Sequence, residues 1–324
     1  MVARGTPREF PFELALCAHL EATTEWVVSR QLGAAVERPG RRIVDVVGVV
    51  PGPDFDDRAV ITDRRIPSRA VESDVGVGEA VPRVRVRNED AMHEGLVDAA
   101  VGAGFFATER RNGREYLRQT TRYPDRWFAG LVGIENKPDL GEPGDLGRQL
   151  RTDVSLGVFE EVVLATASHV TRAHLNRIPE AVGVWRFDPG SGERTVIREP
   201  TTLPAEEAGI ELVDRRPLET EIAVVDGDAK ARARRRIAER AYGKGWRTYD
   251  FPACGHADAT DDGRPYCAHF DRVVDPGRDC RDCEAREPGT APEVDLDALR
   301  ASRTAWDPDP PGVRRRQAGL DRFR

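Results

Sequence analysis

The segment 131–138 (Leu-Val-Gly-Ile-Glu-Asn-Lys-Pro) constrains the fold more than any other stretch of the chain. Its apolar residues predict a short buried strand, which Pro138 ends because proline has no N–H to donate. Side chains alternate across a strand, so we expect Glu135 and Lys137 on one face and Asn136 on the other. A carboxylate and an ammonium at the end of a buried strand are costly without a partner or a task.

Lys137 is also unusual for its residue type. The chain holds 49 lysines and arginines, but only three of them are lysines, at positions 137, 230 and 244. Because arginine supplies almost all other positive charges of the chain, a lysine at position 137 indicates that this residue type matters there. Lysine is a compact point charge with a tunable pKa, which suits work on a water molecule or a phosphate oxygen.

A second strand is predicted at 41–50, where β-branched residues dominate. Asp45 lies in the middle of this run, although aspartate is disfavoured in strands. One interpretation is an edge strand with Asp45 facing water. The other is that Asp45 is placed to join Glu135 and Lys137, and the charged pair favours it.

The flanking segments predict an α/β fold. Residues 9–22 form a helix that contains Glu13, an acid that either belongs to a site or is exposed on the opposite face. Apolar residues recur every four positions across 145–159, which predicts a helix carrying Gln149, and 161–167 has the pattern of a further strand. Strands that alternate with helices indicate an α/β layer.

The order of these elements resembles the PD-(D/E)XK nuclease superfamily, whose fold is called restriction-endonuclease-like. In that family an acid in one strand and an acid-X-lysine motif in the next strand form a metal-dependent site. The resemblance covers residues 8–50 and 127–200. It implies a core with a central mixed sheet flanked by helices.

The resemblance also implies roles for single residues. Asp45 and Glu135 correspond to the two acids, which would bind Mg²⁺, and Lys137 corresponds to the motif lysine, which would orient or deprotonate the attacking water. Glu13 falls where many members carry an acid in the first helix, and Gln149 where some carry a glutamine. Two carboxylates suit Mg²⁺, which prefers oxygen ligands and lowers the pKa of a bound water. The alternative is an ion pair that closes the end of a sheet.

The long separation between Asp45 and Glu135 predicts that residues 51–126 are an insertion. Within it we expect a helix at 88–103 and a β-hairpin around the turn Asn112-Gly113. Arginines at 110, 111, 114, 118 and 122 line this hairpin. A helix followed by a basic hairpin resembles part of a winged-helix module, and the alternative is a solvated hairpin in an arginine-rich chain.

Four cysteines with the spacing C-x12-C-x12-C-x2-C predict a metal-binding module within residues 201–285. They are Cys254, Cys267, Cys280 and Cys283. Zn²⁺ is the first expectation and a [4Fe–4S] cluster the second, in which Cys17 could replace one ligand. His256 and His269 make mixed ligand sets possible, and four unliganded thiols are the remaining alternative. A segment with so few large apolar residues needs a metal to fold.

Composition limits the setting of the chain. Its net charge of −7 and scarcity of lysine resemble salt-adapted archaeal proteins. No apolar run is long enough to span a membrane, and the first residues lack the apolar region of a signal peptide, so we expect a cytoplasmic protein. The basic segment 230–247 is either a solvated helix or one that faces phosphates. Residues 286–324 are expected to be mostly disordered, with one helix near 294–303.

These patterns predict a Mg²⁺-dependent enzyme that hydrolyses phosphodiester bonds in DNA. The rival interpretation is a catalytically inactive nucleic-acid-binding or regulatory protein with a zinc module. If Asp45, Glu135 and Lys137 converge in an open cleft, the enzyme is favoured. If they lie apart, the binding protein is favoured.

Overall fold

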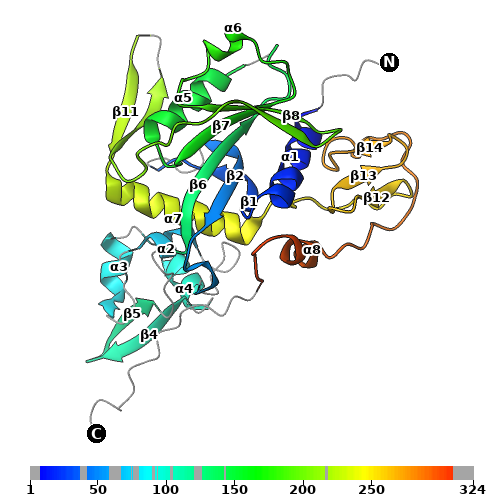
Figure 1. Cartoon of the computed structure of the whole chain (residues 1–324). Helices are drawn as coiled ribbons and strands as arrows, with labels where there is room; N and C mark the ends of the chain where they lie inside the picture. The colour runs from blue at the N-terminus through cyan, green and yellow to red at the C-terminus, as the bar shows by residue number, and fades with distance from the viewer. Residues whose placement is uncertain are drawn as a thin grey trace.

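The computed structural model describes residues 8–308 except 37–41, 58–66, 74, 76–79, 90–91, 93, 103–104, 120–125, 142–143 and 216–217. This part of the chain forms a mixed α/β fold, in which helices flank a central mixed sheet as predicted (Figure 1). No helix in the described part is both long enough and apolar enough to cross a bilayer.

The central sheet has six strands in the order β1-β2-β6-β7-β8-β9. The pairs β1–β2, β2–β6 and β8–β9 are antiparallel, whereas β6, β7 and β8 run parallel to one another. Their bounds are Val27–Gly33 (β1), Ile43–Pro51 (β2), Phe128–Asn136 (β6), Glu161–Thr166 (β7), Gly183–Asp188 (β8) and Glu193–Arg198 (β9).

Two hydrophobic clusters cover the faces of this sheet. The helix α1 (Glu9–Thr23) packs on one face, where its residues Phe12 and Leu16 meet Val46 and Ile134. On the other face lie α5 (Leu146–Leu156) and α7 (Gly227–Lys244), whose apolar residues share a cluster with Leu131. Both layers are therefore built on the strands that carry the predicted acids.

The predicted helix at 9–22, the helix carrying Gln149 and the strand at 161–167 are confirmed. The strand predicted at 131–138 forms as part of β6, which ends at Asn136 and so leaves out Lys137. The single helix predicted at 88–103 is wrong. The chain instead forms α3 (Arg83–Glu89) and α4 (Glu94–Gly102), and Met92, the first residue of the apolar spacing used for the prediction, lies between the two helices. Arg122 lies outside the described residues.

Between β2 and β6 the chain leaves the sheet. It forms the 3-10 helix Phe55–Asp57, α2 (Ser68–Glu72), β3 (Val81–Pro82), the two helices above, β4 (Phe106–Arg111) and β5 (Arg114–Gln119). The predicted hairpin is confirmed: Arg111 pairs with Arg114 around the turn. Asn112 and Gly113 both have positive φ, 51° and 77°, as a two-residue hairpin turn requires.

The C-terminal part adds several smaller elements around the helices that cover the sheet. A hairpin that the sequence did not predict, β10 (Gly209–Arg215) and β11 (Thr220–Val225), lies against α5. After α7 the cysteine-rich segment forms a small sheet of β12 (Ala257–Ala259), β13 (Pro265–Cys267) and β14 (Arg272–Val273). The short helix α6 spans Arg172–Leu175, and the predicted helix near 294–303 is α8 (Leu296–Arg303).

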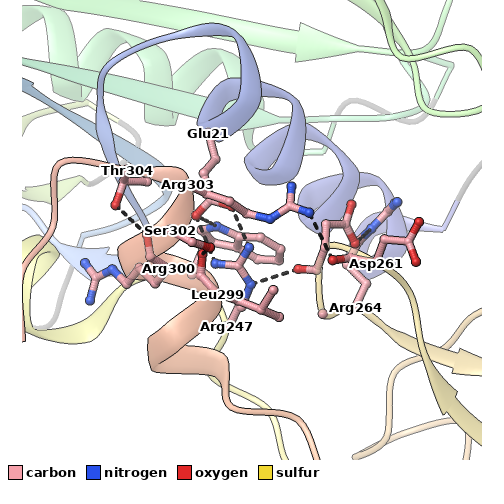
Figure 2. A network of polar contacts seen from close by, with 12 residues as sticks. Glu21, Arg247, Asp261, Arg264, Leu299, Arg300, Ser302, Arg303 and Thr304 are labelled. Atoms are coloured by element: carbon pink, nitrogen blue, oxygen red, sulfur yellow. Dashed lines mark hydrogen bonds and ion pairs between the residues drawn. The ribbon is translucent and has the colours of Figure 1, made fainter.

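Hydrogen bonds of Arg247 connect the cysteine-rich segment to α1 (Figure 2). Its two terminal nitrogens donate to Glu21 of α1 at 2.9 and 2.5 Å, and its Nε donates to the Asp262 carbonyl at 2.9 Å. Arg303 of α8 donates to the neighbouring Asp261 carbonyl at 3.0 Å. The small sheet therefore has a fixed position beside α1.

Candidate functional site

Asp45 and Glu135 lie next to each other at the end of two neighbouring strands. The antiparallel register pairs Val46 with Ile134, so the next pair along the two strands is Asp45 and Glu135. The backbone N–H of Asn136 donates to Asp45 Oδ2 at 2.9 Å. Because β2 lies between β1 and β6, the interpretation of Asp45 as a residue of an edge strand is wrong.

Arg42 joins Glu135 to an acid that the sequence analysis did not single out. Its guanidinium donates to Glu135 and to both oxygens of Asp153 on α5, the latter at 2.8 and 2.5 Å. Arg42 is 8% exposed and the two acids are 3% exposed. Asp153 lies three positions after the buried Leu150 and therefore on the inner face of α5. An acid at that spacing from an apolar residue is the sequence signal that could have identified Asp153 as a candidate.

Glu13 forms the other half of the cluster. It is 4% exposed, so the interpretation that it faces solvent is wrong. Its carboxylate pairs with Arg30 and accepts hydrogen bonds from Gln31 Nε2 at 2.9 Å and from Asn136 Nδ2 at 2.8 Å. Gln31 Nε2 also lies 3.3 Å from Asp45 Oδ1 and thereby links the two acids.

Burial makes this cluster acid-rich and short of positive charge. Burial raises the pKa of the carboxyls of Glu13, Asp45 and Asp153. It also raises the pKa of Glu135 to about 8, and the charge of Asp45 adds to that shift while Arg42 opposes it. In the described part of the chain, two guanidinium groups bind three of these four carboxyls, and Asp45 accepts hydrogen bonds only from the Asn136 N–H and Gln31. The cluster therefore favours a proton or a further cation.

Asn136 supplies an oxygen without a hydrogen-bond partner at the same place. Its Oδ1 is buried and unpaired among the described residues, although its Nδ2 donates to Glu13. A buried amide oxygen without a donor is unfavourable. An amide oxygen is also a ligand type that a hard cation prefers.

Lys137 lies at the rim of the cluster. Its Nζ donates to Glu9 at the start of α1 at 2.9 Å, and its side chain is 26% exposed. Within the described residues no hydrogen bond or ion pair joins it to Asp45 or Glu135. The structure therefore brings together Glu13, Asp45 and Glu135 and places the predicted lysine beside them, not between them.

Gln149 lies one turn before Asp153 on α5, and within the described residues no side-chain hydrogen bond joins it to the acids. It lines a separate cavity of about 510 Å³ together with Arg42 and Glu211. The link between Gln149 and the acids is therefore indirect, through Arg42.

The four cysteines of the C-terminal module line one small cavity, about 20 Å³ in volume, together with His256 and His269. That volume is roughly the room one water molecule needs. No set of three or more histidine, cysteine, aspartate or glutamate side chains in the described ranges is already arranged to hold a metal ion. Cys17 is fully buried in the apolar cluster under α1 and is not among the residues that line this cavity.

Comparison with known protein families shows that the chain belongs to a family whose function is unknown. The model of a family of unknown function (DUF5787) matches residues 27–288, which include the acids at 45, 135 and 153 and all four cysteines of the module. No curated protein and no solved structure matches the chain.

Proposed function

We propose, for a chain that belongs to the DUF5787 family of unknown function, a role as a metal-dependent nuclease that hydrolyses phosphodiester bonds in DNA. The observation that carries the proposal is the pairing of Asp45 with Glu135 on adjacent strands, inside a buried cluster with fewer cations than carboxyl groups. Acids with perturbed pKa values that gather at one place are typical of functional sites.

The order of the elements supports a restriction-endonuclease-like core. α1 carries Glu13, β2 carries Asp45 and β6 carries Glu135, after which α5 and then β7 follow along the chain. α5 connects β6 to a parallel neighbour, β7. This is the order of helix, strands, helix and strand that the resemblance implies.

The donor set fits a hard divalent cation such as Mg²⁺. Asp45 and Glu135 would hold it, since carboxylate oxygens are ligands that Mg²⁺ prefers. When bound, such an ion supplies an acidified water and polarises the phosphoryl group. A cation here would also offset the repulsion that raises the pKa of Glu135.

Two residues of the chain would act on the substrate side of this site. Lys137 would neutralise charge that develops on the phosphate and orient the attacking water. Its present partner Glu9 is 67% exposed, and exposed ion pairs of this kind are weak, so a phosphate can replace the glutamate. Arg42 would have to share Glu135 with the cation, because its guanidinium contacts that carboxylate.

A catalytically inactive nucleic-acid-binding protein is the second candidate, and Arg42 favours it. The guanidinium binds both Glu135 and Asp153 and supplies positive charge where a metal-dependent enzyme needs its ion. If this arrangement persists in the presence of Mg²⁺, the cluster holds the fold together and has no catalytic role.

We also propose that Cys254, Cys267, Cys280 and Cys283 bind Zn²⁺, with a [4Fe–4S] cluster as the alternative. Cys254 precedes β12, Cys267 is the last residue of β13, and Cys280 and Cys283 follow β14. All four border one cavity of a size that suits a single ion. Sulfur donors in a set of four are the ligands of structural zinc sites. The fully buried Cys17 would take no part in either arrangement.

The experiment for the nuclease compares Lys137→Met with Arg172→Met, which removes an exposed cation elsewhere. Both proteins are assayed at high salt with added Mg²⁺ or Mn²⁺ on single-stranded, duplex and branched DNA. Cleavage by Lys137→Met should fall by roughly 10²–10⁴-fold, the range for one positioned acid–base or electrostatic group, while Arg172→Met stays at the wild-type rate. Unchanged cleavage by a less stable Lys137→Met would assign the lysine to an ion pair that only holds the fold.

A further inference from the structure

The insertion between β2 and β6 has the arrangement of a complete winged-helix unit. Along the chain it runs α2, β3, α3, α4, β4, β5, and its three strands pair in the order β3-β5-β4. The buried residues Val86, Val97 and Leu117 join these elements in one hydrophobic cluster. In Figure 1 the β4–β5 hairpin projects from the lower end of the molecule, away from the helix α1.

The hairpin concentrates positive charge in a chain whose net charge is −7. Residues 105–119 contain four arginines and two glutamates. The register places Arg111 opposite Arg114 at the exposed tip, and Arg118 lies on the same face four residues further along β5. Like charges directly opposite each other destabilise a sheet, so this arrangement favours a bound anion.

Most of these guanidinium groups are available for an anion. Arg114 is exposed and Arg118 half-buried, and neither has an acidic partner among the described residues. Arg111 pairs with Glu109 and lies 5.3 Å from the centre of the Tyr116 ring, on the same face. Arginine is well suited to phosphate because its planar fork matches the phosphate oxygens.

The helix that enters the DNA groove in many helix-turn-helix proteins is unsuited to that task here. Its counterpart α4 contains no basic residue, and its side chain Asp98 is 64% exposed and pairs with Arg83 at 2.6 Å. This face would repel a phosphate backbone. The hairpin, not α4, is therefore the part of the unit that complements a nucleic acid.

We infer that the β4–β5 hairpin binds duplex DNA through Arg111, Arg114 and Arg118. A two-stranded ribbon fits the major groove of B-form DNA, whereas the major groove of an RNA duplex is too narrow for side chains to read. This binding goes beyond the proposed cleavage and does not depend on it. β6 alone extends roughly 26 Å between the insertion and the acid cluster, at about 3.3 Å per residue, so the hairpin would hold a duplex well away from the acids.

The test measures binding of the full-length protein to a fluorescein-labelled DNA duplex over a series of salt concentrations. Divalent cations are omitted, so that cleavage does not interfere. The hairpin variant combines Arg111→Gln, Arg114→Gln and Arg118→Gln. A control variant loses three exposed arginines on other surfaces through Arg172→Gln, Arg177→Gln and Arg235→Gln, which leaves the two net charges equal.

The hairpin variant should bind at least about tenfold more weakly, and its slope of log K against log salt should be shallower by up to about 2.7, or 0.9 for each lost phosphate contact. The control should bind like the wild type. Equal losses in both variants, undiminished binding by a folded hairpin variant, or tighter binding of single-stranded DNA or duplex RNA would each overturn the inference. The two proposals fail separately: a wild-type protein that binds the duplex but does not cleave it when Mg²⁺ is added would count against the nuclease and not against the hairpin.

Discussion

Replacement of Arg42 by methionine tests whether the acid cluster needs a cation. Arg42 makes two hydrogen bonds to Asp153, at 2.8 and 2.5 Å, and one to Glu135, and all three residues are more than nine-tenths buried. Methionine keeps much of the stem but leaves both acids without their counter-charge. Loss of one partner from a buried ion pair destabilises a protein by roughly 3–5 kcal/mol, and we expect a loss of free energy of unfolding in that range.

Mg²⁺ should then stabilise Arg42→Met more than it stabilises the wild type. In the wild type the guanidinium competes with the ion, whereas in the variant the carboxylates have no other counter-charge. A ligand at one hundred times its Kd stabilises the native state by about 2.7 kcal/mol, so a saturating ion should restore much of the loss. The assay is urea unfolding at constant ionic strength with and without Mg²⁺, because a guanidinium salt would screen the charges.

The control is the double variant Arg42→Met with Glu135→Gln. It lacks one of the two proposed ligands, so Mg²⁺ should restore little of its stability. Equal shifts of the urea midpoint in the wild type and in Arg42→Met would refute the reasoning. Undiminished rescue of the double variant would refute it as well, since the ion would then act elsewhere on the protein.

Three further changes test the site, the sheet and the cysteine module. Burial raises the pKa of Glu135 from 4.5 to about 8, so the folded chain keeps a proton that the unfolded chain releases, and the stability due to this group falls as pH rises from about 4.5 to about 8. In metal-free urea titrations Glu135→Gln should flatten that decline, and a decline as steep as in the wild type would assign it to other groups. A Cβ at Gly133 would lie 2.8 Å from the Phe159 ring, whereas one at Gly130 would make an ordinary 3.5 Å contact. Gly133→Ala should therefore lower the free energy of unfolding by about 1–3 kcal/mol and Gly130→Ala by much less. Equal melting temperatures of the two variants would contradict this packing. Elemental analysis should find about one Zn²⁺ per chain and less in Cys254→Ser; iron with a brown colour would indicate the cluster instead, and neither metal would end the proposal.

The sequence allowed prediction of the elements that carry the acids because their patterns are local. The β-branched run around Asp45 and the apolar run before Glu135 are each strong strand signals, and both strands form where expected. Their adjacency was predicted because the charged pair Glu135 and Lys137 gave Asp45 residues to join and because the resemblance implies neighbouring strands, and the register of β2 and β6 confirms it. The hairpin followed from Asn112-Gly113 alone.

The contacts inside the cluster could not be predicted because they depend on tertiary packing. Arg42 and Asp153 come from a strand end and a helix that are distant in sequence, and no local pattern pairs them. Lys137 was expected to share a face with Glu135. However, β6 ends at Asn136, and Lys137 instead pairs with Glu9 of α1. Side chains alternate between the two faces only within a strand, so this rule does not determine where the side chain of Lys137 points.

The most direct test of the nuclease proposal is the rate of DNA cleavage by the wild type, Asp45→Asn and Glu135→Gln at saturating Mg²⁺. Circular dichroism first establishes that all three are folded at the salt concentration used. The account predicts metal-dependent cleavage by the wild type and a loss of roughly 10²-fold or more in each variant, because each removes a carboxylate that holds the ion. A folded wild-type protein that cleaves no single-stranded, duplex or branched DNA, and no RNA, with Mg²⁺ or Mn²⁺ would contradict it.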